Sequence, residues 1–280
     1  MIELRKMEMT DIPAGLSFCR SYRWNQLARD WEIFLKLDPD SSIVACEGSE
    51  VAGTLTTMCH GTSLAWIGMV LVDPEKQGRG IARQLLNEAL SMLGDVETIK
   101  LDATPEGKKV YSKLGFRGSN ELSRMEATVQ IEIPQNINTR KIRQTDLPAL
   151  LAIDKEIFGE ERGQLLQWLF DGAPEFAFMT ETNGGIGGFC FGRKGARFSQ
   201  VGPIIASAPE TAIQLLSAAL GACKGSPVVI DVLHYDEQWM AFLGSLGFRL
   251  QRSLTRMILG PDRFPGIPAK QFAIAGPEYG

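Results

Sequence analysis

The clearest change of hydrophobic pattern along the chain lies between residues 65 and 93. The run Ala65–Val72 is almost wholly apolar, which is typical of a buried strand. After a polar loop, apolar residues recur at the spacing of one helical face, at Ala82, Leu85, Leu86, Ala89, Leu90 and Leu93. This part of the sequence therefore predicts a strand, a loop and an amphipathic helix, in that order.

The rest of the first half also mixes the helical and the strand pattern. A helix is expected to begin at Thr10 or Asp11, because Pro13 is tolerated in a first turn. Further helix is expected from Trp24 to Leu37, and a short helix around Tyr111. Apolar or alternating runs predict strands at 42–46, 51–58, 99–103 and 123–133. The expected fold class is α/β with a mixed sheet.

Several segments of the first half recur in the second half. Leu114–Arg117 and Arg124-Met125 return, with the same offset, as Leu246–Arg249 and Arg256-Met257. The other pairs are Thr10–Pro13 with Thr145–Pro148 and Leu101-Asp102 with Ile230-Asp231. Such a long period is not that of a solenoid repeat. It favours two α/β units over a single large sheet, a first domain at 1–134 and a second at 139–280, joined by the polar stretch 134–139.

The loop between the predicted strand and helix has the features of an anion site. Gly78 and Gly80 permit a left-handed backbone and close approach of a ligand. The N-terminus of the following helix offers free N–H groups and a favourable dipole. No Gly-Lys-Ser/Thr follows, and G-x-G-x-x-G is absent, so the loop is neither a P-loop nor a dinucleotide loop. A glycine-rich turn without a ligand is the alternative at this point.

The order Gln-x-x-Gly-x-Ala at Gln77–Ala82 resembles motif A of the GNAT superfamily of N-acetyltransferases, where this loop holds the pyrophosphate of acetyl-CoA. Tyr111–Phe116 resembles a second family motif, in which the tyrosine starts a short helix and protonates the leaving thiolate. The family often has Asn and Ala where Thr104 and Gly107 stand, which puts those pantetheine contacts in question. The resemblance implies two tandem GNAT-like units and cofactor contacts from Met69, Val70, Leu71, Val72, Gln77, Gly78, Arg79, Gly80, Ile81, Ala82, Thr104, Gly107 and Tyr111.

The second copy lacks the groups that carry this chemistry. Aligning the paired leucines of the two helices places Glu210 on Gly80, and aligning the Leu-Gly-Phe segments places Leu243 on Tyr111. A carboxylate at the loop repels a phosphate ligand and blocks its approach. The second unit is therefore expected to be degenerate and to serve structure and substrate binding, as in a bacterial tandem GNAT branch that the chain resembles. Its residues 183–185 read as a hairpin turn.

Composition narrows the class of partner. A net charge of −4 and a pI of about 5.4 disfavour nucleic acid and an anionic membrane surface as partners. No apolar run approaches the roughly 18 residues of a transmembrane helix. The five cysteines form no C-x-x-C pair, which favours a reduced, cytoplasmic protein. His60 and His234 are the only histidines, without metal-ligand spacing, so no metal is expected. The protein is expected to be a monomer or a homodimer.

The acceptor is the least determined part of the sequence interpretation. A small-molecule primary amine is expected, and its deprotonation calls for a general base such as Asp30, His60 or Asp102. Each of these residues also has an ordinary structural explanation. The residues expected to contact the acceptor are Trp24, Asp30, Arg162 and Arg193. A non-catalytic acyl-CoA sensor or scaffold and an acetyltransferase of peptide or protein amines remain alternatives, although Tyr111 favours an enzyme.

Overall fold

The computed structural model describes residues 1–40, 42–128, 138–182, 184–223, 225–233 and 236–280. The strands form one mixed sheet in the order β1-β2-β3-β4-β5-β12-β6-β11-β10-β9-β8-β7, with β13 paired to β10. The first half of the chain contributes β1 (Ile2–Lys6), β2 (Ile43–Glu47), β3 (Glu50–His60), β4 (Leu64–Val72), β5 (Thr98–Ala103) and β6 (Arg117–Thr128). The second half contributes β7 (Thr139–Lys141), β8 (Phe178–Thr182), β9 (Gly185–Lys194), β10 (Ser199–Ala206), β11 (Pro227–Leu233), β12 (Arg249–Leu259) and β13 (Gln271–Ala273).

The helices pack on this sheet in two corresponding sets. The first unit has α1 (Ile12–Ser21), α2 (Ala28–Leu37), α3 (Ile81–Met92) and α4 (Pro105–Ser112). The second unit has α5 (Leu147–Phe158), α6 (Gly163–Gly172), α7 (Pro209–Cys223) and α8 (Glu237–Ser245). Apolar side chains of α1, α2, α5 and α6 share one core between the units. None of the helices in the described ranges is both long and apolar enough to cross a membrane.

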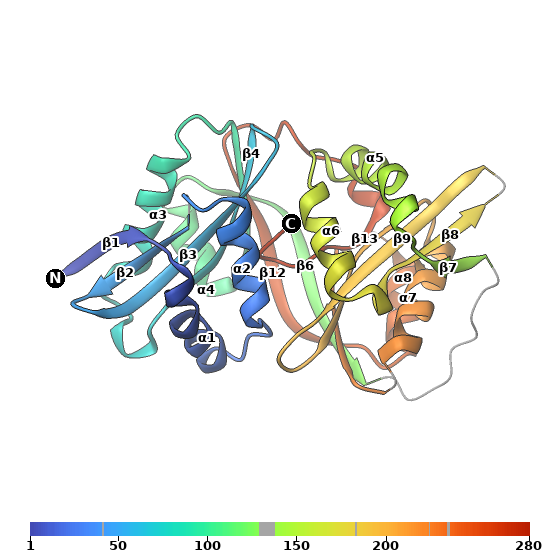
Figure 1. Ribbon diagram of the computed structural model, residues 1–280, viewed down its shortest axis with the longest axis horizontal. Helices are drawn as coiled ribbons and strands as arrows, with labels where there is room; N and C mark the ends of the chain where they lie inside the picture. The colour runs from blue at the N-terminus through green and yellow to red at the C-terminus, as the bar shows by residue number, and fades with distance from the viewer. Residues whose placement is uncertain (41, 129–137, 183, 224, 234–235) are drawn as a thin grey trace.

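The two units exchange their long final strands. Strand β12 of the second unit lies between β5 and β6, and β6 of the first unit lies between β12 and β11. These two strands run side by side through the middle of the molecule, with the helices of one unit to either side (Figure 1). The mixed α/β class and the two units predicted from the sequence are confirmed. The interpretation against a single large sheet is wrong, because the exchanged strands join both units into one.

The exchange explains why an Arg and an Asp recur in both halves. Arg124 Nε lies 2.7 Å from Asp231 Oδ1, and Arg256 Nε lies 2.9 Å from Asp102 Oδ1. Each pair has a second hydrogen bond through Nη2 and is buried. Such bidentate pairing offsets the cost of removing both charges from water. Each ion pair therefore joins an arginine of one unit to an aspartate of the other.

Most element boundaries follow the sequence pattern, with three differences. Helix α2 begins at Ala28 rather than Trp24, and β6 begins at Arg117 rather than Ser123. Tyr111 lies near the end of α4 and not at its start, because Thr104 caps that helix and accepts a hydrogen bond from Gly107 N. The expected junction after residue 134 and position 183 of the expected hairpin turn lie outside the described residues.

Strands β4 and β5 separate at the level of the glycine loop. They pair in parallel only from Leu64–Thr98 to Trp66–Lys100, and beyond these residues no pairing joins them. In the same region β4 carries a bulge opposite β3, where Met69 has a φ of 48°. Such a value is strained for a bulky residue, and it is held here by a 2.9 Å hydrogen bond from Thr54 Oγ1 to Met69 O. The divergence is the splay that the family resemblance implies.

Candidate active site

The splay between β4 and β5 opens into a cavity of about 980 Å³. Its walls come from β4, the glycine loop, the first turns of α3 and α4, strands β6 and β12, and the C-terminal segment. Every residue expected to contact the cofactor lines this cavity except Arg79. Three segments that are separate along the chain, and that the family resemblance assigns to one site, therefore meet in this cavity.

The glycine loop has the backbone that an anion site requires. Gly78 and Gly80 have φ angles of 75° and 77°, and a Cβ added at either would meet open space. Among the described residues, no backbone or side-chain acceptor pairs with the N–H groups of residues 78–83. Arg83 lies exposed in the first turn of α3 and also lines the cavity. These groups can hold a phosphate at the helix N-terminus.

Two polar side chains of the loop are used within the protein. Arg79 turns away from the cavity and binds Glu47 through both terminal nitrogens, with an Nη1–Oε2 distance of 3.1 Å. That guanidinium lowers the pKa of Glu47 to about 2. Gln77 donates to the hydroxyl of Tyr22, which donates to Val72 O at 2.6 Å. Arg79 can therefore offer a ligand its backbone, while its side chain fixes the loop to the β2–β3 hairpin.

Tyr111 presents an unpaired phenol to the cavity. Its ring packs edge-on against Phe116, with centroids 6.0 Å apart, and lies over Gly107. A Cβ at Gly107 would come within 2.9 Å of the ring, so the absence of a side chain here lets the ring approach this closely. Among the described residues the Tyr111 hydroxyl has no hydrogen-bond partner, and burial raises its pKa to about 12. The phenol is therefore protonated at neutral pH and can donate a proton.

His60 and Asp102, two of the expected base candidates, are committed to other contacts. His60 is buried and donates from Nε2 to Tyr279 O at 3.1 Å, and burial lowers its pKa to about 3. Asp102 lines the cavity, but its two oxygens accept from Arg256 at 2.9 and 3.0 Å. His60 does not line the cavity, and both carboxylate oxygens of Asp102 are held by Arg256, so neither is placed to act as the base.

Asp30, Arg162 and Arg193 were expected to meet the acceptor, yet none of them lines the cavity. Asp30 is buried at the start of α2, where Oδ2 accepts from Leu27 N at 2.6 Å. Arg162 binds both oxygens of Asp154, at 2.8 and 2.9 Å. The expected direct contact is thus corrected, because these charges are removed from the cavity by pairing with each other or with nearby groups.

Arg193 links the buried charges to the cavity. Its Nη1 lies 2.9 Å from Asp30 Oδ2, as an ion pair whose angle does not make a hydrogen bond. Its Nη2 donates to Glu278 Oε1 at 2.7 Å and to Gln200 Oε1 at 2.8 Å. Trp24, the fourth expected acceptor residue, does lie in the cavity wall. Arg193 can thus act on a ligand only through Glu278.

Glu278 is the candidate functional residue that sequence reasoning missed. It lines the cavity although its side chain is only 4% exposed. Oε1 accepts from Arg193 and from Gln26 Nε2, whereas Oε2 has no hydrogen-bond partner among the described residues. The segment that carries it is fixed to β4 by a 2.9 Å hydrogen bond from Trp66 Nε1 to Pro277 O. No local periodicity in the sequence predicts where this segment docks.

The corresponding gap in the second unit is filled by the chain itself. Strands β10 and β11 pair in parallel only at Ser199–Val228 and Gln200–Val229. Beyond these pairs β13 adds to β10, with Ile204 opposite Ala273, and the Ile274 N–H donates to Asp231 O at 3.0 Å. The second unit therefore has its own peptide where the first unit has a cavity.

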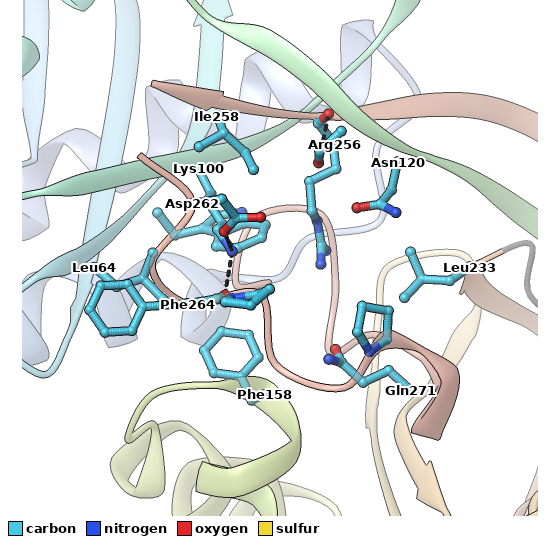
Figure 2. Close-up of a pocket in the computed structure, with 14 residues that line it drawn as sticks. Leu64, Lys100, Asn120, Phe158, Leu233, Arg256, Ile258, Asp262, Phe264 and Gln271 are labelled. Atoms are coloured by element: carbon cyan, nitrogen blue, oxygen red, sulfur yellow. Dashed lines mark hydrogen bonds and ion pairs between the residues drawn. The ribbon is translucent and has the colours of Figure 1, made fainter. Parts of the chain in front are cut away.

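A smaller cavity of about 290 Å³ is lined by residues of β4, β5, β12 and the segment between β12 and β13. Figure 2 shows the Arg256 side chain entering it between Asn120 and Lys100. Lys100 Nζ is already bound by Asp262 at 2.9 Å and by the Phe264 carbonyl (Figure 2). Phe158, the last residue of α5, also lines this smaller cavity. The charged residues of the smaller cavity are paired within the protein, so the larger cavity is the better candidate for a ligand site.

The fold and the larger cavity define the class of the protein. Residues 25–130 match the acetyltransferase (GNAT) domain, and residues 150–273 match a second acetyltransferase (GNAT) domain. The chain therefore belongs to the GNAT acetyltransferase family, with two such domains in tandem, and it is an acyltransferase. The family resemblance drawn from the sequence motifs is confirmed.

Individual relatives cover most of the chain. YitH of Bacillus subtilis, an uncharacterised N-acetyltransferase, is 26% identical over 82% of this chain and 82% of its own length. Holothin acyltransferase of a Pseudoalteromonas species is 25% identical over 92% of this chain and 87% of its own. The crystal structure of a protein from Pyrococcus horikoshii assigned as an acetyltransferase is similar with a TM-score of 0.84, at 21% identity, over 100% of this chain and 96% of that one. The structural likeness shows the fold.

Proposed function

We propose that this protein transfers the acetyl group of acetyl-CoA to the primary amine of a small molecule, in the cavity of its first unit. The observation that carries the proposal is the cavity itself, where a glycine loop with free N–H groups adjoins a splayed, bulged strand and an unpaired phenol. A relative named for acyl transfer to holothin is consistent with a small acceptor.

The cofactor's parts have matching groups in the cavity wall. The pyrophosphate would bind the N–H groups of residues 78–83 and the guanidinium of Arg83. The pantetheine amides would pair with the open edge of Met69–Val72, as an added strand pairs with a sheet edge. The bulge at Met69 leaves a backbone position outside the β3–β4 ladder, which suits polarisation of the thioester carbonyl. No metal is required in this scheme.

The proposed reaction is a direct attack of the amine on the thioester carbonyl. Glu278 Oε2 would accept the ammonium proton, since it is the carboxylate oxygen left free in the cavity wall. The amine nitrogen then forms the new C–N bond, the C–S bond breaks, and the thiolate leaves. Tyr111 would donate its proton to that thiolate, and the proton that the nitrogen loses as it becomes an amide would return Tyr111 to the phenol.

The direct test is product analysis with acetyl-CoA and a panel of amines, amino acids, polyamines and peptides. We expect free thiol to appear only with an amine, in equal amount to the N-acetylated product. Thiol release with peptides alone would favour the peptide acceptor. Tight acetyl-CoA binding without release in any mixture would contradict the proposal.

Glu278→Gln should lower kcat by about 100-fold or more and leave acetyl-CoA affinity unchanged. The amide keeps the shape of the side chain and can still accept from Gln26, but it cannot accept the amine proton. Steady-state kinetics with a saturating amine, together with titration of acetyl-CoA binding, provides the measurement.

The matched control is Asp154→Asn, which also removes a buried carboxylate from an arginine pair, away from the cavity. Asp154→Asn leaves the buried guanidinium of Arg162 without its counter-ion, whereas in Glu278→Gln Arg193 keeps its ion pair with Asp30, so a thermal melt of both variants accompanies the kinetics. Only Glu278→Gln should lower kcat in the folded enzyme. Equal loss of kcat in both variants would show that Glu278 is structural.

A further inference from the structure

Apart from the exposed Arg83 at the start of α3, one arginine of the cavity wall has no counter-ion among the described residues. Arg252, on β12, lines the cavity and is only partly exposed. Within the described part of the chain it forms no ion pair and no hydrogen bond through its side chain. A guanidinium with five N–H donors that is partly buried and unpaired calls for an explanation.

The other charges on this side of the cavity are paired. Arg124 binds both oxygens of Asp231, at 2.7 and 2.8 Å. Asp102 is bound by Arg256, and Glu278 by Arg193. The protein therefore balances its own buried charges here and leaves the guanidinium of residue 252 in excess.

The surroundings of Arg252 disfavour an unpaired positive charge. It lies directly opposite Arg124 in the β6–β12 ladder, where like charges repel. Burial and Arg124 lower the pKa of Arg252, while Asp231 and Glu106 raise it without forming an ion pair. Glu106 is exposed in the first turn of α4, so its charge is largely screened by water. An anion placed against Arg252 would relieve this repulsion.

The cofactor does not explain Arg252. The charges of acetyl-CoA are on its phosphates, and the phosphate site is formed by the loop and by Arg83 at the start of α3. Arg252 comes instead from β12, three residues before Thr255, which pairs with Ala103 at the end of β5. In the same wall lie Leu254 and Glu278. Since the loop, α3 and β4 are assigned to the cofactor, this wall is the part of the cavity that remains for the acceptor.

We propose that the acceptor carries a carboxylate that Arg252 binds, so that the substrate class is amino acids and related amino carboxylates. The planar fork of a guanidinium matches a carboxylate through two parallel hydrogen bonds. Glu278 and Arg252 then give the cavity one negative and one positive contact, complementary to a zwitterion. This inference rests on the proposed acetyl transfer.

The experiment compares each of several amino acids with its own carboxamide, as acceptors for wild type, Arg252→Gln, Arg252→Lys and Arg249→Gln. Arg249 is the matched control, because it lies exposed on the same strand and does not line the cavity. Wild type should prefer the carboxylate form by roughly 10- to 100-fold in kcat/KM, the range of a hydrogen bond to a charged group. Arg252→Gln should remove that preference through the acceptor KM, with acetyl-CoA KM unchanged. Arg252→Lys should retain part of the preference, and Arg249→Gln all of it.

Equal use of carboxylates and carboxamides by the wild type would overturn the inference while leaving acetyl transfer intact. A rise in acetyl-CoA KM in Arg252→Gln, without loss of the carboxylate preference, would also overturn it and assign Arg252 to the cofactor. Absence of thiol release with every amine would overturn the proposed function and this inference together.

Discussion

Gly80→Glu should reduce acetyl-CoA affinity at least about 100-fold, which corresponds to roughly 2.7 kcal/mol or more. Gly80 has a φ of 77°, and a left-handed conformation costs about 1–2 kcal/mol for a residue with a side chain. Gly80 lines the cavity, and a Cβ at this position would have no neighbouring atom within 4 Å, so the protein has room for the glutamate side chain. The added carboxylate would repel the pyrophosphate. Calorimetric titration with acetyl-CoA measures the loss.

The control for this variant is Gly247→Glu. Gly247 also has a left-handed φ, of 83°, and open space around its Cβ position, but it does not line the cavity. Both variants add the same charge and a similar backbone strain, so the difference between them isolates the loop. Unchanged affinity in Gly80→Glu, or an equal loss in both variants, would remove the loop from cofactor binding.

Tyr111→Phe should lower kcat about 100-fold and leave the acetyl-CoA dissociation constant nearly unchanged. Only the hydroxyl is lost, and it has no hydrogen-bond partner among the described residues, so the ring can keep its packing against Phe116. Because burial raises the pKa of Tyr111 to about 12, its proton is present throughout the working range. The wild-type rate should therefore show no fall from Tyr111 below about pH 10.

Steady-state kinetics with the same amine, together with a thermal melt, measures this effect. The melting temperature should stay close to that of the wild type. A variant with near wild-type kcat would contradict the role of Tyr111 as proton donor and leave it a packing residue of α4.

The parts of the site that are local in sequence were predictable. Gln77–Ala82 follows a strand and opens a helix, so three adjacent elements define it. Tyr111 and its Leu-Gly-Phe neighbour are likewise local. At Gly107, where the sequence departs from the family pattern, the Tyr111 ring occupies the space of a Cβ.

The remaining parts depend on contacts between segments far apart along the chain. The exchange of β6 and β12 could not be predicted, because each strand would show the same alternating pattern whether it paired within its own unit or with the other unit. The acidic partners of Arg162 and of Arg193 could not be predicted, because a sequence shows that a residue is charged but not whether it is buried or which residue it pairs with. Glu278 and Arg252 reach the cavity from the second half of the chain, whose own gap is filled by β13.

The most direct test of the account is the number of acetyl-CoA molecules that each chain binds. Equilibrium titration of the wild type should give one per chain, and Gly80→Glu should abolish that binding. Glu210→Gly, which removes the carboxylate aligned with Gly80, should leave the stoichiometry at one, because β13 pairs with β10 in the second gap. Two molecules per chain in the wild type, or one that persists in Gly80→Glu, would contradict a single cofactor site in the first unit.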